Sequence, residues 1–360
     1  MEFYLLRTLP KINHSASKRK LNAKFKVRGI KAWSNVKAKF GELPPLCVVD
    51  GWHDGKSYLI GSRHGCYVMD KELEDVNASS VFGDKRIANI AVYKDMAVVF
   101  PSEHAIFVVL DCVNQAIEFE SDILLTQHFG IGKTWSQYSG FVEVCQNELY
   151  MLTEDKRNLI SIDLVELYTQ VKNIKDSTNK LKFNSKKLAE GVSSFCCYNN
   201  KPGKVWYHDA EGSLFHNGRQ LHSSLECGYA NTMAAFKSSL VVGYHDGLTY
   251  GSKIAMVTKG GVLMDEVVLD KNRQSQDLKD IKTVETKRFS VAIAVSIYDC
   301  YHVFGVVGRK IVNLGEGLRP GISSLQVTHG MKIQDVKKYS IDVVLNMSDG
   351  NIYTITLQIV

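Results

Sequence analysis

Short apolar segments alternate with polar turns along most of the chain. The segments are rich in Val, Ile, Leu, Tyr and Phe, a composition typical of β-strands. Several of the turns contain Gly after Asp, His or Glu, and Gly supplies the positive φ angles that tight hairpins require. Seven pairs of segments therefore predict β-hairpins: 57–62 with 66–69, 96–101 with 105–110, 148–152 with 159–162, 204–207 with 213–216, 240–244 with 248–250, 291–297 with 301–307, and 341–346 with 351–357.

These hairpins recur at an interval of about 47 residues, which is the spacing of blades in a β-propeller. In that fold, four-stranded sheets pack face to face around a central axis, so each sheet is buried on both faces. This explains why segments such as 291–297 are continuously apolar instead of alternating. The pattern predicts an all-β fold, a seven-bladed β-propeller over residues 42–360.

The two ends of the chain suggest how the ring closes. Residues 3–7 have the composition of a strand, and the last predicted strand reaches the final residues 352–360. If an N-terminal strand pairs into the last blade, two unpaired sheet edges disappear. We therefore expect residues 1–41 to contain a closing strand at 3–7 and a basic arm, followed by the propeller at 42–360.

One helical pattern interrupts the strands. Asp163 is placed as an N-cap with Glu166 three residues later, and five apolar side chains then share one helix face: Leu164, Leu167, Tyr168, Val171 and Ile174. A Lys-, Asn- and Ser-rich stretch follows. We expect a helical insertion and linker at about 163–189, between the third and fourth blades. The helix would dock a partner through Leu164, Leu167, Tyr168 and Val171; a long solvated loop is the alternative.

The strand–turn–strand repeat at this interval resembles the WD-repeat-like β-propeller superfamily over about residues 42–360. The resemblance is one of pattern and period, because no Trp-Asp dipeptide ends a blade and no Gly-His pair opens one. It implies a rigid interaction platform that binds peptides or domains on its top face and its rim.

Charge divides the chain into two parts. Residues 3–41 contain eleven Lys and Arg and no Asp or Glu, whereas the rest of the chain has 33 basic residues against 38 acidic ones. The overall net charge of +6 therefore describes a mildly acidic body with one basic segment.

The candidate binding residues lie in this segment: Lys18, Arg19, Lys20, Lys24, Lys26, Arg28, Lys31, Trp33, Lys37 and Lys39. Three interpretations remain open. The segment contacts RNA or DNA through phosphates and aromatic stacking, it docks onto an acidic protein or acts as a nuclear import signal, or it is simply a solvated arm. Lys24, Lys26 and Arg28 alternate as in a strand, whereas the residues around Lys18 are typical of a loop.

The amino-acid composition argues against a disordered chain, a membrane-spanning protein and a disulfide-stabilised protein. With 45% hydrophobic and 23% charged residues, disorder along the whole chain is excluded. No apolar run approaches the roughly 18 residues of a membrane helix, so no membrane association is expected. The eight cysteines form no CxxC pair. They indicate reduced thiols and an intracellular location, nuclear or cytoplasmic.

Motifs for catalysis are missing from the sequence, including GxSxG, HExxH and Cys/His metal spacings. We therefore expect no enzyme activity, no cofactor and no metal, but a scaffold subunit that binds other proteins in a larger intracellular assembly. Two alternatives stay open: a propeller hydrolase or lyase with carboxylates lining the central channel, and a substrate receptor or adaptor that uses the 163–189 insertion.

Overall fold

The structure is a computed structural model that describes the strands, one helix and several turns of the chain. The residues described are 24–32, 48–52, 57–62, 65–70, 76–77, 87–101, 106–110, 116–120, 142–152, 158–173, 181–182, 185–198, 204–222, 229–246, 251–269, 278–296, 300–307, 310–318, 327–347 and 351–359.

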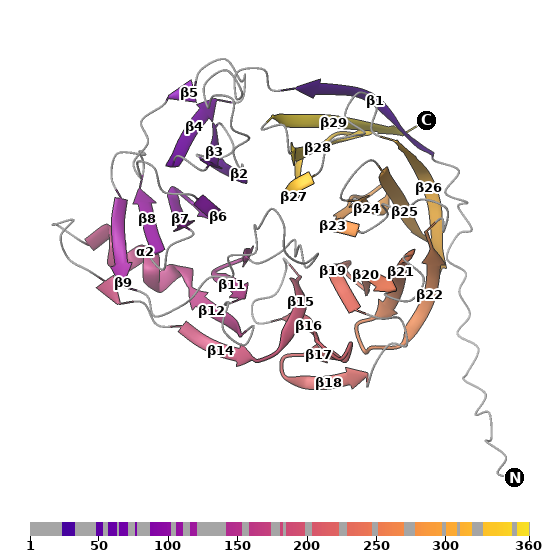
Figure 1. The fold of residues 1–360 in the computed structure, drawn as a ribbon, viewed down its shortest axis with the longest axis horizontal. Coiled ribbons are helices and arrows are strands. Elements are labelled where there is room, and N and C mark those ends of the chain that lie inside the picture. Colours follow the sequence, from indigo (N-terminus) through magenta and orange to yellow (C-terminus); the bar gives the residue numbers. More distant parts are fainter. Residues whose placement is uncertain are drawn as a thin grey trace, which may run out of the picture.

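Within these residues, seven antiparallel sheets stand around a central axis as the blades of a β-propeller (Figure 1). The first strand of each blade lies nearest the axis and the fourth lies at the rim. The predicted all-β propeller is confirmed. Blades 1 to 3 contain the following strands: β2 Val48–Trp52, β3 Ser57–Ser62, β4 Gly65–Asp70 and β5 Val76–Asn77; β6 Ile87–Tyr93, β7 Met96–Pro101, β8 Ile106–Leu110 and β9 Ala116–Glu120; β10 Val142–Cys145, β11 Glu148–Leu152, β12 Leu159–Asp163 and β14 Ser185–Ala189.

Blades 4 to 7 follow the same order around the ring. Their strands are β15 Val192–Cys197, β16 Val205–Asp209, β17 Leu214–His216 and β18 Arg219–His222; β19 Tyr229–Ala235, β20 Ser239–Asp246, β21 Gly251–Thr258 and β22 Leu263–Val268; β23 Leu278–Glu285, β24 Ser290–Ser296, β25 Cys300–Val307 and β26 Lys310–Leu318; β27 Val327–Val336, β28 Ser340–Met347, β29 Ile352–Ile359 and β1 Phe25–Ala32.

The seven predicted hairpins are the second and third strands of the seven blades. In blade 5 the third strand is β21, Gly251–Thr258, and the predicted residues 248–250 lie outside the described residues. These middle strands are buried on both faces: in β24, every residue after Ser290 is buried. Neighbouring blades cover each face, which explains the continuous apolar runs.

An N-terminal strand closes the last blade, as predicted, but it lies further along the chain than residues 3–7. The closing strand is β1, which pairs antiparallel with β29 from Phe25 opposite Ile359 to Ala32 opposite Tyr353 (Figure 1). Because β28 occupies the other edge of β29, no edge of β29 remains for another strand. Residues 3–7 lie outside the described residues.

The contact between β1 and blade 6 depends on a glycine. Phe25 is 1% exposed and packs edge-on against Phe289, with ring centroids 5.9 Å apart. On β26, a Cβ at Gly315 would collide with the carbonyl oxygen of Phe25. Glycine therefore allows the backbones of blades 6 and 7 to come together where the ring closes.

The predicted helix is present as α2, Leu164–Asn173. Asp163 caps it, since its Oδ1 accepts hydrogen bonds from the backbone N–H of Val165 at 2.8 Å and of Glu166 at 3.0 Å. The insertion lies within blade 3, between its third strand β12 and its outer strand β14, and not between blades 3 and 4. The predicted linker is also wrong in part, because Ser185–Ala189 is β14 itself, and β13 (Leu181–Lys182) pairs in parallel with β9 of blade 2.

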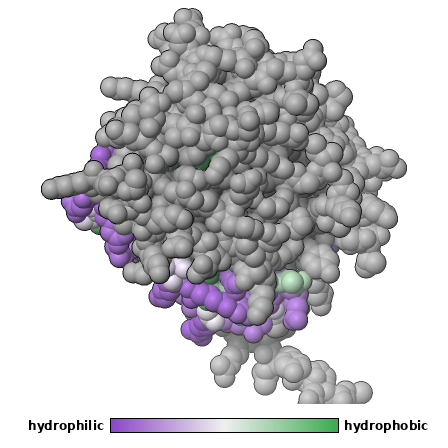
Figure 2. Space-filling view, turned by 60° about the vertical axis from the view of Figure 1, so that its left-hand side comes forward, coloured by the Kyte–Doolittle hydropathy of each residue, from purple (hydrophilic) through white to green (hydrophobic). Residues whose placement is uncertain are grey.

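Figure 2 shows one side of the molecule, where the described residues at the surface are mostly hydrophilic. This fits a fold in which the apolar faces of the sheets are buried between blades. None of the described helical residues forms a segment long and apolar enough to cross a membrane.

Candidate functional site

Four of the predicted basic residues lie on or beside the closing strand β1. Lys24, Lys26, Arg28 and Lys31 are all exposed. The others, Lys18, Arg19, Lys20, Trp33, Lys37 and Lys39, lie outside the described residues. Lys26 and Arg28, which alternate as in a strand, lie on β1, and Lys24 lies immediately before it.

The sequence of β1 explains why its cations face outward. Phe25 is buried, and Val27 and Ile30 pack against the same apolar cluster between blades 6 and 7. The register of β1 against β29 shifts between Val27 and Gly29, so one extra residue, Arg28, is accommodated there. This bulge keeps Ile30 on the buried face although it follows Val27 by three positions.

An exposed aromatic residue lies beside the start of β1. Tyr339, in the turn between β27 and β28, is 53% exposed, and its backbone oxygen accepts a hydrogen bond from Ile359, the partner of Phe25. Lys338 Nζ lies 4.9 Å and Arg288 Cζ 5.6 Å from the centre of the Tyr339 ring. Hydrogen bonds from Lys338 and then Arg288 lower the pKa of the Tyr339 hydroxyl.

We call Lys24, Lys26, Arg28, Lys31, Arg288, Lys338 and Tyr339 the basic rim surface. It gathers residues from β1 and from turns of blades 6 and 7. The sequence does not indicate Arg288, Lys338 and Tyr339, because only the fold brings the turns of blades 6 and 7 together. Lys337, in the same turn, is engaged elsewhere: its Nζ lies 2.8 Å from Asp342 Oδ2 and 3.6 Å from Asp335 Oδ2.

The helix face predicted to dock a partner is occupied by the protein's own core. Leu164, Leu167 and Val171 are at most 4% exposed and pack with residues of blades 2 and 3, including Phe100 and Leu149. Tyr168 is half-buried, and its ring meets Tyr93 edge-on. This prediction is corrected for Leu164, Leu167 and Val171, which fill the space between two blades and are not available to another protein; Tyr168 remains partly exposed.

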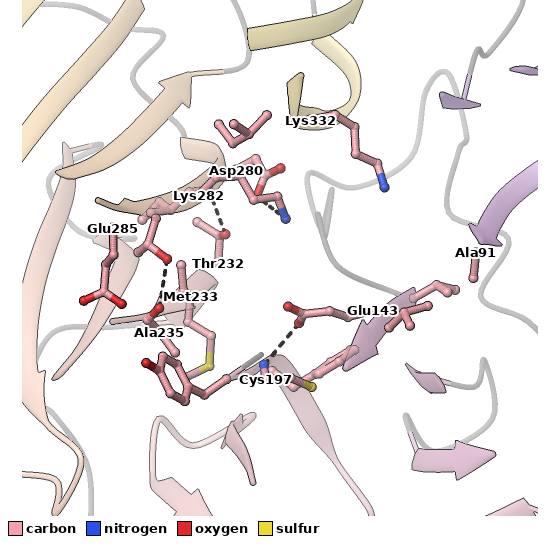
Figure 3. Close-up of a pocket in the computed structure, with 18 of the residues that line it drawn as sticks. Ala91, Glu143, Cys197, Thr232, Met233, Ala235, Asp280, Lys282, Glu285 and Lys332 are labelled. Atoms are coloured by element: carbon pink, nitrogen blue, oxygen red, sulfur yellow. Dashed lines mark hydrogen bonds and ion pairs between the residues drawn. The ribbon is translucent and has the colours of Figure 1, made fainter. Parts of the chain in front are cut away.

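The central channel contains a cavity of about 600 Å³ lined by the innermost strands of blades 2 to 7 (Figure 3). Charged side chains of both signs reach it from three blades: Glu143 from β10, Asp280 and Lys282 from β23, and Lys332 from β27. Glu143 and Lys332 point toward the middle of the cavity.

Asp280 holds two inner strands together. Its Oδ2 accepts a hydrogen bond from the backbone N–H of Met331 on β27 at 2.9 Å, and its Oδ1 lies 3.5 Å from Lys282 Nζ. Burial lowers the pKa of Lys282, but the nearby carboxylates of Asp280 and Glu143 outweigh this effect and the net shift is upward. The ammonium group therefore stays charged inside the channel.

Glu143 connects blade 3 to blade 4. Its Oε2 accepts a hydrogen bond from the backbone N–H of Cys197 at 3.2 Å (Figure 3). Burial raises the pKa of this carboxyl, although Lys282 opposes the shift. Among the residues that the structure describes, no group of three or more His, Cys, Asp and Glu lies close enough to hold a metal ion.

Comparisons with known proteins show similarity in fold. No family model matches the sequence, and no curated protein matches it. Among solved structures, the N-terminal domain of Nup159 is 12% identical, with 93% of this chain and 96% of that chain covered and a TM-score of 0.56. Virginiamycin B lyase from Staphylococcus aureus is 10% identical, with 94% and 100% covered and a TM-score of 0.60.

A third similar structure is a chain of the Mitotic Checkpoint Complex. It is 8% identical, covers 99% of this chain and 98% of that chain, and has a TM-score of 0.58. At these identities the comparisons show the fold alone: the chain is a β-propeller. The similar structures include a component of a protein complex as well as an enzyme, so the fold is compatible with both classes.

Proposed function

We propose that this protein is a non-enzymatic interaction scaffold within a larger intracellular assembly, and that its basic rim surface binds an acidic protein segment. The observation that supports this proposal most strongly is the position of Lys24, Lys26, Arg28 and Lys31, all exposed on or beside a strand whose other face is fixed in the core. Cations held on a rigid strand lose less conformational entropy on binding than cations on a free arm.

The edge of β1 favours a peptide over a nucleic acid. Among the described residues, β1 is the last strand of its sheet and pairs with β29 alone. An extended peptide can add to such an edge through backbone hydrogen bonds. Alternate side chains of that peptide, about 7 Å apart, would bring acidic groups beside the cations of β1. A nucleic acid could use the charges and Tyr339 but not the backbone edge.

The experiment measures binding of the full chain to a poly-glutamate peptide and, separately, to single-stranded oligothymidylate. In the test variant, Lys26→Ser and Arg28→Ser remove two cations from β1. In the matched control, Lys186→Ser and Lys187→Ser remove two exposed cations from β14, the outer strand of blade 3. We expect the test variant to bind the peptide roughly tenfold more weakly at low salt, with a flatter salt dependence.

The β14 control distinguishes binding at a specific site on β1 from binding that depends only on the net charge of the protein. If the β14 variant loses as much affinity as the β1 variant, the protein binds anions through net charge and the proposal is wrong. If only binding to oligothymidylate depends on Lys26 and Arg28, the partner is a nucleic acid.

A propeller enzyme is the second candidate, and one observation favours it. Glu143 is a carboxyl with a raised pKa that points into a cavity beside Lys282 and Lys332, which is a common setting for acid–base catalysis. Small molecules can be screened for those that raise the melting temperature of the full chain. A ligand that stabilises the wild type but not Glu143→Gln, and is consumed by the wild type, would establish this alternative.

A further inference from the structure

Three cysteines lie at the boundary between blades 3 and 4. Cys145 ends β10, and Cys196 and Cys197 end β15; all three are free thiols at most 5% exposed. Successive side chains of a strand point to opposite faces, so the two adjacent cysteines enter different cores. Cys196 packs with Trp206 in the core shared with blade 5, whereas Cys197 packs with Cys145 in the core shared with blade 3.

Cys145 and Cys197 belong to the same buried cluster between the two blades. Each thiol affects the pKa of the other. Cys145 Sγ also lies 3.2 Å from the backbone oxygen of Tyr198, the residue after Cys197, and the Glu143 carboxylate accepts a hydrogen bond from the Cys197 N–H. Two hydrogen bonds therefore fix the end of β10 against the end of β15.

The two thiols differ in their chemistry. The interaction with Cys197 lowers the pKa of Cys145 despite burial, which makes Cys145 the more reactive of the two thiols. Burial raises the pKa of Cys197 well above its usual value, so this residue stays a thiol. Cys197 also lines the central cavity (Figure 3).

We propose that Cys145 and Cys197 are an oxidisable pair, which a hydroperoxide converts into a disulfide joining the innermost strands of blades 3 and 4. The Cys145 thiolate attacks the O–O bond of hydrogen peroxide, forming a sulfenic acid and releasing hydroxide, which takes up a proton to become water. The Cys197 thiol then attacks the Cys145 sulfur. The S–S bond forms as the sulfenic hydroxyl leaves with the thiol proton as a second water.

The test treats the full reduced chain with hydrogen peroxide, alkylates the remaining thiols and maps disulfide-linked peptides by mass spectrometry. We expect a link between the peptide containing Cys145 and the peptide containing Cys197. Because Cys196 and Cys197 are adjacent, one tryptic peptide holds both, and variants must distinguish them. The link should persist in Cys196→Ser and disappear in Cys197→Ser.

A second measurement uses the wild type alone and does not depend on the folding of a variant. Oxidation should raise the melting temperature by several degrees, and a thiol reductant should reverse the change, because the cross-link restricts the unfolded chain. A disulfide of Cys145 with any cysteine other than Cys197, or no link in the wild type after peroxide treatment, would overturn the proposal. A link that survives in Cys197→Ser would do so too.

Discussion

Blades 3 and 7 differ from the other blades in how they obtain the outer strand. In blade 7, the outer strand β1 comes from the opposite end of the chain and pairs with β29. In blade 3, the chain leaves the sheet after β12, forms α2 at the rim, pairs briefly with blade 2 through β13, and returns as β14. Both blades complete four strands, but the interactions that hold the outer strand in place are different.

Blade 7 depends on close approach between backbones, whereas blade 3 depends on side-chain packing. At the closure, Gly315 of β26 lies directly against the backbone of Phe25. At blade 3, Leu164, Leu167 and Val171 of α2 fill the space between blades 2 and 3. The comparison indicates that an added methyl group is most damaging at blade 7, and that a removed side chain is most damaging at blade 3.

The largest loss of stability is expected for Gly315→Ala. Its Cβ would collide with the Phe25 carbonyl oxygen. Either β1 must move away from blade 6, or the backbone of β1 and β26 must be strained. We expect the free energy of unfolding to fall by about 3 kcal/mol or more, measured by urea denaturation. Gly29→Ala on β1 is the control, because its Cβ meets nothing within 4 Å. Equal stability of the two variants would show that β1 can move away from β26 without destabilising the protein.

A smaller loss is expected when the α2 core is truncated. Leu167→Ala removes a side chain that is 4% exposed and leaves a cavity between blades 2 and 3. Such changes cost about 2–4 kcal/mol, and the urea midpoint should fall accordingly. Val165→Ala on the exposed face of the same helix should change stability by no more than about 0.5 kcal/mol. If both variants behave alike, α2 does not hold blade 3 together.

The smallest loss of stability is expected when the N-terminal cap of α2 is removed. Asp163→Ala removes the acceptor for the N–H groups of Val165 and Glu166 and should cost about 1 kcal/mol. Asp163→Asn retains the side-chain oxygen and should keep most of that stability. The urea midpoints of the three proteins give the comparison; a loss in the Asn variant as large as in the Ala variant would assign the effect to charge at the helix end.

The sequence predicts the two middle strands of each blade well, but not the innermost strands, and it predicts the outer strands poorly. The second and third strands form local hairpins, so their turns and apolar runs are visible in a single chain. The partners of β1 and β14 are chosen by packing between distant residues. In β1, Lys26 and Arg28 interrupt the apolar pattern, which made residues 3–7 the more strand-like segment.

The same distinction between local and distant contacts explains which residues of the candidate sites the sequence could predict. The cations of β1 are evident from the charge pattern, but Arg288 and Tyr339 come from turns of two different blades, and only the fold brings these two residues together. The channel charges Glu143, Asp280 and Lys332 come from three strands far apart in the chain, so no local motif indicates them. The helix face was detected correctly, but an apolar face has the same periodicity whether it meets a partner or the protein's own core.

The pairing of β1 with β29 has a consequence for synthesis on the ribosome. β1 is made first, but its partner begins at Ile352, more than 300 residues later. At about 5–20 residues per second, β1 waits roughly 15 to 60 s before the ring can close. An unpaired edge strand can pair with a strand of another chain and so promote aggregation. Lysine on such an edge makes this pairing less favourable. Lys24, Lys26, Arg28 and Lys31 place such charges on and beside β1, and we expect them to discourage association of this strand before β29 is made.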